Sequence, residues 1–158
     1  MSGSRTHNYR VDLTWQGNRG TGTSDYRVYG REYVIAGADK PVLTGSADPA
    51  FLGDSAHYNP EEMLVAALSA CHMLWYLHLC ADAGVVVTAY EDGASGAMAR
   101  VGDGLQFTEV VLAPRVALTP GADRERALAL HGEAHARCFI ARSVNFPVRC
   151  RPEIRPDA

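Results

Sequence analysis

The sequence predicts an α+β fold, in which strands come in runs instead of alternating one by one with helices. Three observations indicate this. Residues 9–15 alternate apolar and polar side chains, residues 59–83 form a long apolar run with helix start and stop signals, and residues 85–118 return to β-branched runs broken by glycine. A chain of 158 residues can bury one core, so we expect a single domain over residues 1–158.

The N-terminal part is expected to contain three strands, at residues 9–15, 23–28 and 32–36. The glycine-rich stretch 16–22 is a turn, and Gly30 separates the second strand from the third. Residues 37–59 are rich in Gly, Pro, Ser and Asp and have little period, which predicts a loop. A loop this long in so small a domain is often functional.

A helix is predicted from Pro60 to about Ala83. Asn59 is a suitable N-cap, proline suits the first helical position, and Glu62 stands where the acid of a capping box reaches back. Gly84 can take the left-handed conformation that ends a helix.

The apolar part of this helix, residues 63–79, is nearly long enough to cross a membrane. His72 and His78 lie inside it, acidic residues open it, and neither flank has the Lys or Arg cluster that sets orientation. The sequence therefore favours a helix buried on nearly all sides within a soluble core, with no membrane partner.

The remaining elements follow in order. We expect a strand at 85–90, a hairpin of strands 94–101 and 105–118 around the glycines at 102 and 104, and a second helix at 123–136. A short break at Arg137 and Cys138 precedes another helical turn at 139–144, and residues 146–154 close the chain as a strand.

Charge and the N-terminal residues argue against a nucleic-acid-binding protein and a secreted protein. The formal net charge is −3 with both signs spread along the chain, and no basic stripe marks a nucleic-acid binder. The first ten residues lack the apolar core of a signal peptide, so we expect a cytoplasmic protein.

Four cysteines, at positions 71, 80, 138 and 150, are therefore not expected to form structural disulfides, because the cytosol keeps thiols reduced. Cys80 follows Cys71 by nine residues, and at roughly 100° per residue it lies on the opposite side of the helix. Cys150 alternates with Val148 in the terminal strand. Small buried hydrophobic side chains are the expected roles of Cys80 and Cys150.

Cys71 and Cys138 differ from these two. Small residues surround Cys71, so another group can approach the helix closely there. Cys138 is predicted at the N-terminus of a helical piece, where free N–H groups and the helix dipole stabilise a thiolate. On the residues alone, a reactive and a structural role both stay open for each.

A metal site is not predicted. His72, His78, Cys80, His135 and Cys138 are ligand types, but the chain has no C-x₂-C pair. His135 and Cys138 form one pair at best, without a partner pair at the usual spacing. His72 and His78 are more often helix-packing residues than ligands.

Two segments resemble a known family. Asn59-Pro-Glu-Glu-Met-Leu-Val-Ala-Ala-Leu-Ser-Ala-Cys71 is similar to the N-P-E-x-L-x-x-A-x-x-x-C segment of the OsmC/Ohr peroxidases, with the leucine shifted by one residue. Ala134-His-Ala-Arg-Cys138 is similar to the start of their A-H-x-x-C-P-x-S segment. Both occur in the family's order, and the resemblance extends from Trp15 to Val148.

This resemblance implies roles by position. Cys71 matches the peroxidatic thiol, which becomes a sulfenic acid, and Cys138 matches the resolving thiol, which condenses with it to a disulfide. Glu61 matches the active-site glutamate, and Arg19 matches the arginine that accompanies the thiolate in the Ohr branch. Arg31 is a rival to Arg19, because some OsmC-branch members take their arginine from the strand that follows.

The resemblance also implies a fold and partners. Family members are intertwined homodimers whose antiparallel sheets wrap around central helices. The substrates are organic hydroperoxides, with hydrogen peroxide a poorer one; the reductant is a dithiol, of lipoyl type in the family, and no cofactor is involved. An apolar pocket lined by Met73, Leu74, Trp75 or Phe139 would favour a hydrophobic organic peroxide.

The residue types agree with that chemistry. Burial raises the pKa of a thiol, an adjacent arginine counters this, and a glutamate can orient the arginine. Phe139 replaces the family's proline and Ala141 its frequent serine, so the segment around Cys138 is expected to differ. Two alternatives remain: a non-catalytic relative that binds a small apolar ligand or thiol carrier, and a thiol–metal site.

Overall fold

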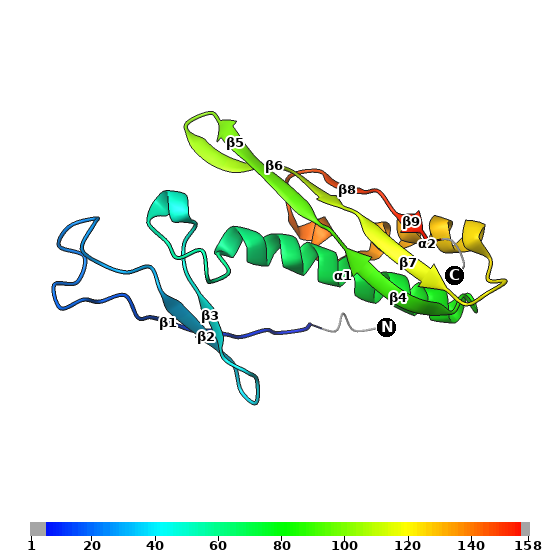
Figure 1. Cartoon of the computed structure of the whole chain (residues 1–158), viewed down its shortest axis with the longest axis horizontal. Coiled ribbons are helices and arrows are strands. Elements are labelled where there is room, and N and C mark those ends of the chain that lie inside the picture. Colours follow the sequence, from blue (N-terminus) through cyan, green and yellow to red (C-terminus); the bar gives the residue numbers. More distant parts are fainter. Residues whose placement is uncertain (1–5, 156–158) are drawn as a thin grey trace. The chain divides into compact units, whose positions relative to one another are not determined.

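The computed structural model describes residues 6–155 and consists of two compact units, Met1–Met63 and Leu64–Ala158 (Figure 1). The long helix that begins at Pro60 contributes its first turn to the N-terminal unit and the rest to the C-terminal unit. The assignment of all 158 residues to one domain stays a prediction.

The N-terminal unit contains a three-stranded antiparallel sheet in the order β1-β2-β3. Trp15 pairs with Tyr33, and Tyr33 pairs with Gly45 on its other side. The predicted loop at 37–59 therefore contains a strand, and it also contains a 3₁₀ helix. The elements are β1 (Asp12–Trp15), β2 (Tyr33–Ala36), β3 (Leu43–Gly45) and η1 (Pro49–Phe51).

The predicted strand at 23–28 is wrong, because residues 20–29 form turns and bends. The Asn18 carboxamide accepts from the N–H groups of Gly20 and Gly22, and the Asp25 carboxylate accepts from Arg27 N. These side chains satisfy the backbone locally, which is how Asn and Asp compete with strand pairing.

Helix α1 (Pro60–Asp82) confirms the predicted boundaries. The Asn59 side chain accepts from Glu62 N at 2.8 Å, and the Glu62 carboxylate accepts from Asn59 N at 3.1 Å, which is a reciprocal capping box. Gly84 has a φ of 70°, so it ends the helix in the left-handed conformation that favours glycine.

Two three-stranded sheets of the C-terminal unit have the orders β4-β7-β9 and β5-β6-β8. Each combines an antiparallel pair with a parallel one, so the sheets are mixed and not purely antiparallel as expected. Their strands are β4 (Val87–Asp92), β5 (Ser95–Val101), β6 (Gly104–Leu112), β7 (Pro114–Leu118), β8 (Val148–Cys150) and β9 (Glu153–Ile154).

Two predicted strands are each divided. Residues 105–118 change sheet at Ala113, whose N–H donates to the Asp92 carboxylate at 2.7 Å instead of to a neighbouring strand. Pro114 follows and has no N–H to donate. Residues 146–154 are divided at Pro152 for the same reason, and each half pairs with a different sheet.

Helix α2 (Arg124–Arg137) begins at Asp123, whose carboxylate accepts from Arg126 N, and it is followed by the 3₁₀ turn η2 (Ala141–Ser143). Two apolar clusters form the core of this unit. One joins α1, β7 and α2 through Tyr76, Val116 and Leu130; the other joins α1 to β6 through Leu68 and Val110.

Within the single chain, α1 is buried along one face only. Its buried residues are Leu68, His72, Tyr76, Leu79 and Cys80, whereas Leu74 is 63% exposed. The helix is long and apolar enough to pass a length-and-composition test for a membrane span. Its buried face nevertheless carries the two core clusters of the unit.

Candidate functional site

Cys71 and Cys138 lie next to each other in the C-terminal unit. Cys71 stands in the middle of α1 and is half-buried, and Cys138 is the C-terminal cap of α2 and is 1% exposed. The two thiols are close enough for Cys71 to raise the pKa of Cys138, and both are free. Residues that are 67 positions apart in the sequence are thus brought together by the packing of the segments that carry them.

Cys138 is held as a neutral thiol. Burial raises its pKa to about 11, which outweighs a hydrogen bond from Ala141 N to its sulfur at 3.5 Å; the contact with Cys71 raises the pKa further. Cys138 lies between two helical pieces, as predicted: it is the C-terminal cap of α2, and Arg142 N donates to its carbonyl oxygen at the start of the following turn. The N–H groups of this turn lower the pKa of the thiol, but burial outweighs them.

Aromatic side chains lie beside the pair. Trp75, one helical turn after Cys71, packs edge-on against Phe139 at a centroid distance of 5.3 Å. The Arg137 guanidinium lies 5.9 Å from the Trp75 ring centroid. Phe139 thus provides an apolar contact beside the resolving candidate, in the position where the resembled segment has proline.

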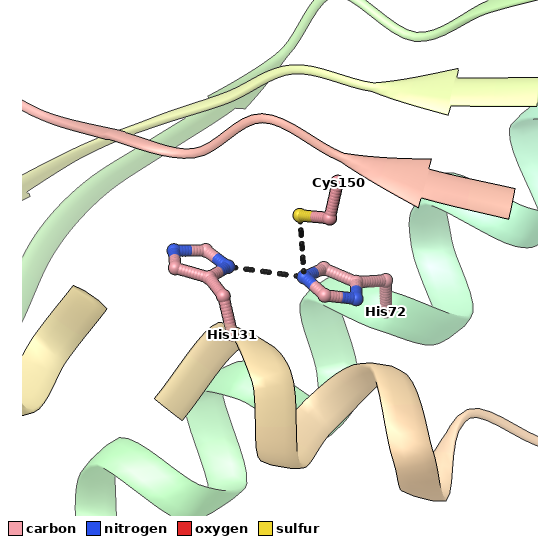
Figure 2. Close-up of side chains that lie close together, drawn as sticks. All are labelled: His72, His131 and Cys150. Carbon is pink, nitrogen blue, oxygen red and sulfur yellow. Dashed lines mark hydrogen bonds between the residues drawn. The ribbon is translucent and has the colours of Figure 1, made fainter. Parts of the chain in front are cut away.

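The other two thiols have different surroundings. Cys80 is buried against Tyr76 in the core, as expected for a small apolar side chain. Cys150 is not only a small apolar side chain, because its sulfur makes a polar contact. The sulfur lies 3.5 Å from His72 Nε2, and His72 in turn contacts His131 (Figure 2). His78 is exposed and pairs with Asp82 at 3.4 Å.

Sequence reasoning missed this His72–His131–Cys150 cluster. His131 was not singled out, although it precedes His135 by four residues, a spacing that puts both on one face of a helix. His72 was expected to be a packing residue and Cys150 a small hydrophobic one. The three come from α1, α2 and β8, and only the tertiary structure brings them together.

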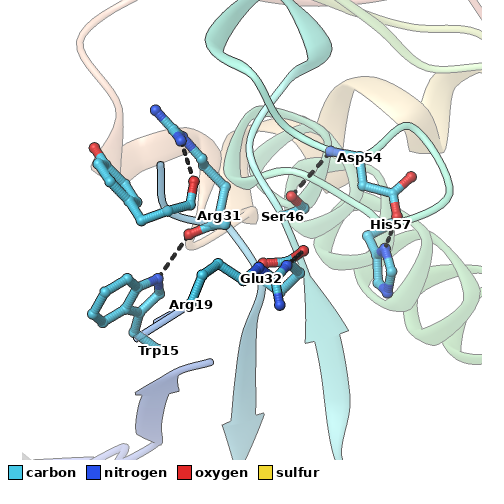
Figure 3. Close-up of polar contacts among 9 residues, drawn as sticks. Trp15, Arg19, Arg31, Glu32, Ser46, Asp54 and His57 are labelled. Carbon is cyan, nitrogen blue, oxygen red and sulfur yellow. Dashed lines mark hydrogen bonds and ion pairs between the residues drawn. The ribbon is translucent and has the colours of Figure 1, made fainter. Parts of the chain in front are cut away.

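The predicted arginines and the glutamate belong to the N-terminal unit. Arg19 Nη2 donates to Glu32 Oε1 at 2.5 Å, so its carboxylate partner is Glu32 and not Glu61 as expected (Figure 3). Glu61, in the first turn of α1, instead lies close enough to Tyr33 to raise the pKa of that phenol, although burial of Tyr33 is the larger cause.

Arg31 is held by aromatic rings and carbonyls. Its guanidinium lies 4.4 Å from the Tyr26 ring centroid and 4.0 Å from that of Tyr29. It also donates to the backbone carbonyls of both tyrosines. These contacts fix the loop before β2, whereas Arg19 is half-exposed and pairs with the Glu32 carboxylate.

Residues 53–153 match the model of the OsmC-like protein family, which is more than half of the chain. The chain belongs to the OsmC-like family. A search of curated proteins found no match.

Solved structures show the same OsmC-like fold. An OsmC-like protein of unknown function from Vibrio cholerae O1 biovar eltor is 30% identical, with a TM-score of 0.86, over 93% of this chain and 99% of that one. The organic hydroperoxide resistance protein OhrB of Bacillus subtilis is 19% identical, with a TM-score of 0.62, over 93% and 98%.

A further relative is described as a putative organic hydroperoxide resistance protein from Vibrio cholerae, with captopril bound in one of its active sites. It is 21% identical, with a TM-score of 0.67, over 96% of this chain and 94% of that one. The predicted α+β OsmC-like fold is confirmed, and the long apolar helix α1 is a core helix of that fold.

Proposed function

We propose that this OsmC-like protein is a thiol-dependent peroxidase that reduces organic hydroperoxides. The observation that carries the proposal is the proximity of Cys71 to Cys138, both as free thiols. Membership of a family that includes organic hydroperoxide resistance proteins supports it. A pair of contacting cysteines can pass from dithiol to disulfide with little rearrangement.

The environments of the two thiols support different roles. Cys71 is half-buried, so a substrate can reach it, whereas Cys138 is almost fully buried and has a raised pKa. The Cys71 thiolate attacks one oxygen of the hydroperoxide; the O–O bond breaks, and the other oxygen leaves as an alcohol after taking a proton. Cys138 then attacks the Cys71 sulfenic acid, water leaves, and a disulfide forms.

A dithiol returns the pair to its reduced state by thiol–disulfide exchange and is itself oxidised to a disulfide. A lipoyl-type dithiol is our proposed reductant, and the cytoplasm, where such reductants are maintained, is the proposed location. Trp75 and Phe139 beside the thiols favour an apolar peroxide over hydrogen peroxide. An alkyl or aryl group that packs against these rings removes apolar surface from water, and hydrogen peroxide has no such group.

Arg19, Arg31 and Glu61 are proposed to support the reaction from the N-terminal unit. Arg19 is the stronger candidate for stabilising the thiolate, because a carboxylate already orients it as an ion pair. Arg31 is occupied by two tyrosines. The exposed side of α1, which includes Leu74, is the proposed contact with a second copy in a homodimer.

Stopped-flow kinetics with cumene hydroperoxide test the proposal. The Cys71→Ser variant should consume peroxide at least about 1000-fold more slowly than the parent, because the nucleophile is gone. Cys80→Ala is the matched control, since it removes a thiol from the opposite side of the same helix and should leave the rate unchanged. A Cys71→Ser protein as fast as the parent would refute the proposal.

Mass spectrometry separates catalysis from ligand binding. One equivalent of peroxide should produce a Cys71–Cys138 disulfide in the parent. In the Cys138→Ser variant it should produce a Cys71 sulfenic acid that dimedone traps. A parent that forms neither species, yet still binds cumyl alcohol, would be a non-catalytic binding protein.

A further inference from the structure

His72, His131 and Cys150 form a buried cluster separate from the thiol pair. His72 Nε2 lies 3.0 Å from His131 Nδ1 and 3.5 Å from Cys150 Sγ, and all three ligand atoms lie within 4.8 Å of one another. Figure 2 shows the three side chains pointing toward a common point from α1, α2 and β8.

The cluster is well shielded from solvent. His72 is 0% exposed and His131 is 2% exposed, and the Tyr76 ring stacks on His131 at a centroid distance of 3.8 Å. Outside the cluster, His72 Nδ1 and His131 Nε2 find no hydrogen-bond partner among the described residues. The two nitrogens that face each other in the cluster are the opposite ones, His72 Nε2 and His131 Nδ1, and these are the atoms placed to bind a shared group.

A pocket of about 280 Å³ opens onto the cluster. It is lined by His131, Cys150 and His135, so two of the three ligand atoms belong to residues that a solute can approach. His135 follows His131 by one helical turn, lies close enough to His72 to affect its charge, and has a buried, unpartnered Nδ1.

We propose that His72, His131 and Cys150 bind a zinc ion, with the fourth coordination position toward the pocket. The donor set is two imidazole nitrogens and one sulfur, which suits Zn²⁺ and excludes the oxygen-seeking Mg²⁺ and Ca²⁺. Tetrahedral zinc with ordinary bond lengths places two nitrogens about 3.3 Å apart and a nitrogen and a sulfur about 3.5 Å apart.

The observed separations of 3.0 Å and 3.5 Å are close to those values. The two imidazole rings are nearly parallel, at 6°, and share one hydrogen bond edge to edge. Zinc would replace the shared proton, and the nitrogens would separate by a few tenths of an ångström as the rings tilt. The third pair, His131 Nδ1 and Cys150 Sγ, lies within 4.8 Å, so binding also requires these two atoms to approach each other.

The charges around the cluster also suit a cation. Imidazole binds zinc as a neutral ligand and cysteine as a thiolate, so binding at Cys150 releases a proton to the buffer.

Asp92 supplies the balancing negative charge. Its carboxylate accepts from Ser69 Oγ at 2.5 Å and from Ala113 N at 2.7 Å, and it acts electrostatically on both His72 and Cys150. One divalent ion, one thiolate and one nearby carboxylate add up to no net buried charge. Binding therefore avoids the large cost of burying an isolated charge.

Zinc titration by calorimetry tests the site, with protein that carries no histidine tag and is reduced by a phosphine. The Cys71→Ser/Cys138→Ser double variant is used beside the parent so that the thiol pair cannot compete. Both should bind one zinc per chain, with release of a proton. Cobalt in place of zinc should give a thiolate-to-metal charge-transfer band and tetrahedral visible bands.

In the double-variant background, Cys150→Ser should abolish the cobalt charge-transfer band and weaken zinc binding at least about tenfold, and His131→Gln should weaken it comparably. His78→Gln, an exposed histidine of α1, is the matched control and should bind zinc like its parent. Circular dichroism of each variant separates ligand loss from misfolding.

Absence of stoichiometric zinc in the folded parent would overturn the proposal. Binding that survives Cys150→Ser and His131→Gln together but is lost in Cys71→Ser/Cys138→Ser would also overturn it, because zinc would then sit on the thiol pair. Neither result bears on peroxide reduction, which depends on different side chains.

Discussion

The two units differ in how they bury apolar surface. Every buried hydrophobic residue of the described part of the chain lies between Leu68 and Cys138, in the C-terminal unit. The buried side chains of the N-terminal unit are polar, Ser46 and Asn59, while Leu13, Val42 and Leu43 are more than half exposed. The N-terminal sheet is therefore held by strand pairing and polar contacts, and the C-terminal unit by its core.

This difference indicates which unit can hold a site of fixed geometry and which needs a partner surface. A packed core fixes side chains in one arrangement, which suits the contact between two thiols and the convergence of three metal-ligand atoms. An open sheet with exposed apolar residues needs a further surface to cover it. In the proposed homodimer, a second copy supplies surface of this kind, and the arginines are carried by the less buried unit.

Matched leucine substitutions should show the largest difference between the units. Leu68→Ala, at a position that is 0% exposed, should lower the free energy of unfolding by about 2–5 kcal/mol, because it removes buried contacts and leaves a cavity. Leu43→Ala, at a position that is 57% exposed, should change it by less than about 0.5 kcal/mol.

Urea denaturation at two protein concentrations measures both leucine effects. If Leu43→Ala lowered the free energy of unfolding nearly as much as Leu68→Ala, the inferred difference in burial between the two units would be wrong. If that cost grew with protein concentration, a second copy would be the surface that buries Leu43.

Alkylation of Cys138 should show the next largest effect. The rise of its pKa from 9.0 to about 11 leaves about 100-fold less thiolate near pH 8, and thiolate is the reactive form. In a Cys71→Ser/Cys80→Ala/Cys150→Ser background, burial of Cys138, the largest cause of the shift, is kept and the smaller effect of Cys71 is lost. Iodoacetamide should then react with Cys138 at least about tenfold more slowly than with a cysteine placed at the exposed Ser55.

The rate at Cys138 should rise with pH toward 11. Because the folded protein holds this proton more tightly than the unfolded chain, the associated stability is present below pH 9 and is lost as pH rises toward 11. Equal alkylation rates at the two positions near pH 8 would contradict the burial of Cys138.

Substitution of the two arginines should give the smallest effects and decide between them. Arg19→Ala should slow Cys71 oxidation about tenfold, a modest loss of electrostatic support for the thiolate, with little change in thermal stability. Arg31→Ala should lower the melting temperature, since each lost cation–π contact contributes about 0.5–1 kcal/mol. Stopped-flow kinetics and thermal unfolding measure these separately, and a reversed pattern would make Arg31 the catalytic arginine.

Local signals in the sequence were enough to predict much of the fold. The capping box of Asn59 and Glu62, Gly84 after α1 and Asp123 before α2 each act within a few residues, so helix boundaries follow from neighbours in the chain. The divided strand at Ala113 depends instead on Asp92, which is 21 residues away in the sequence. The sequence pattern around residues 105–118 contains no trace of that contact.

The candidate site shows the same division. The resemblance of two segments placed Cys71 and Cys138 as a pair, and the structure brings them into contact. The partner of Arg19 was expected to be Glu61 and is Glu32, because the pairing is decided by which strand follows the loop. The cluster of His72, His131 and Cys150 depends on three elements at once, and no spacing along the chain encodes such a meeting.

Cys71 and His72 are consecutive residues of α1, and each points to a different partner on or just after α2: Cys71 to Cys138, and His72 to His131. Consecutive side chains point about 100° apart around a helix, so the two contacts hold α1 from two directions and prevent its rotation about its own axis. Rolling the helix to shorten one contact would lengthen the other. In the proposed catalytic cycle, the movement that closes the disulfide must therefore come from the short segment after α2 that carries Cys138. Helix α1 keeps its orientation during this step.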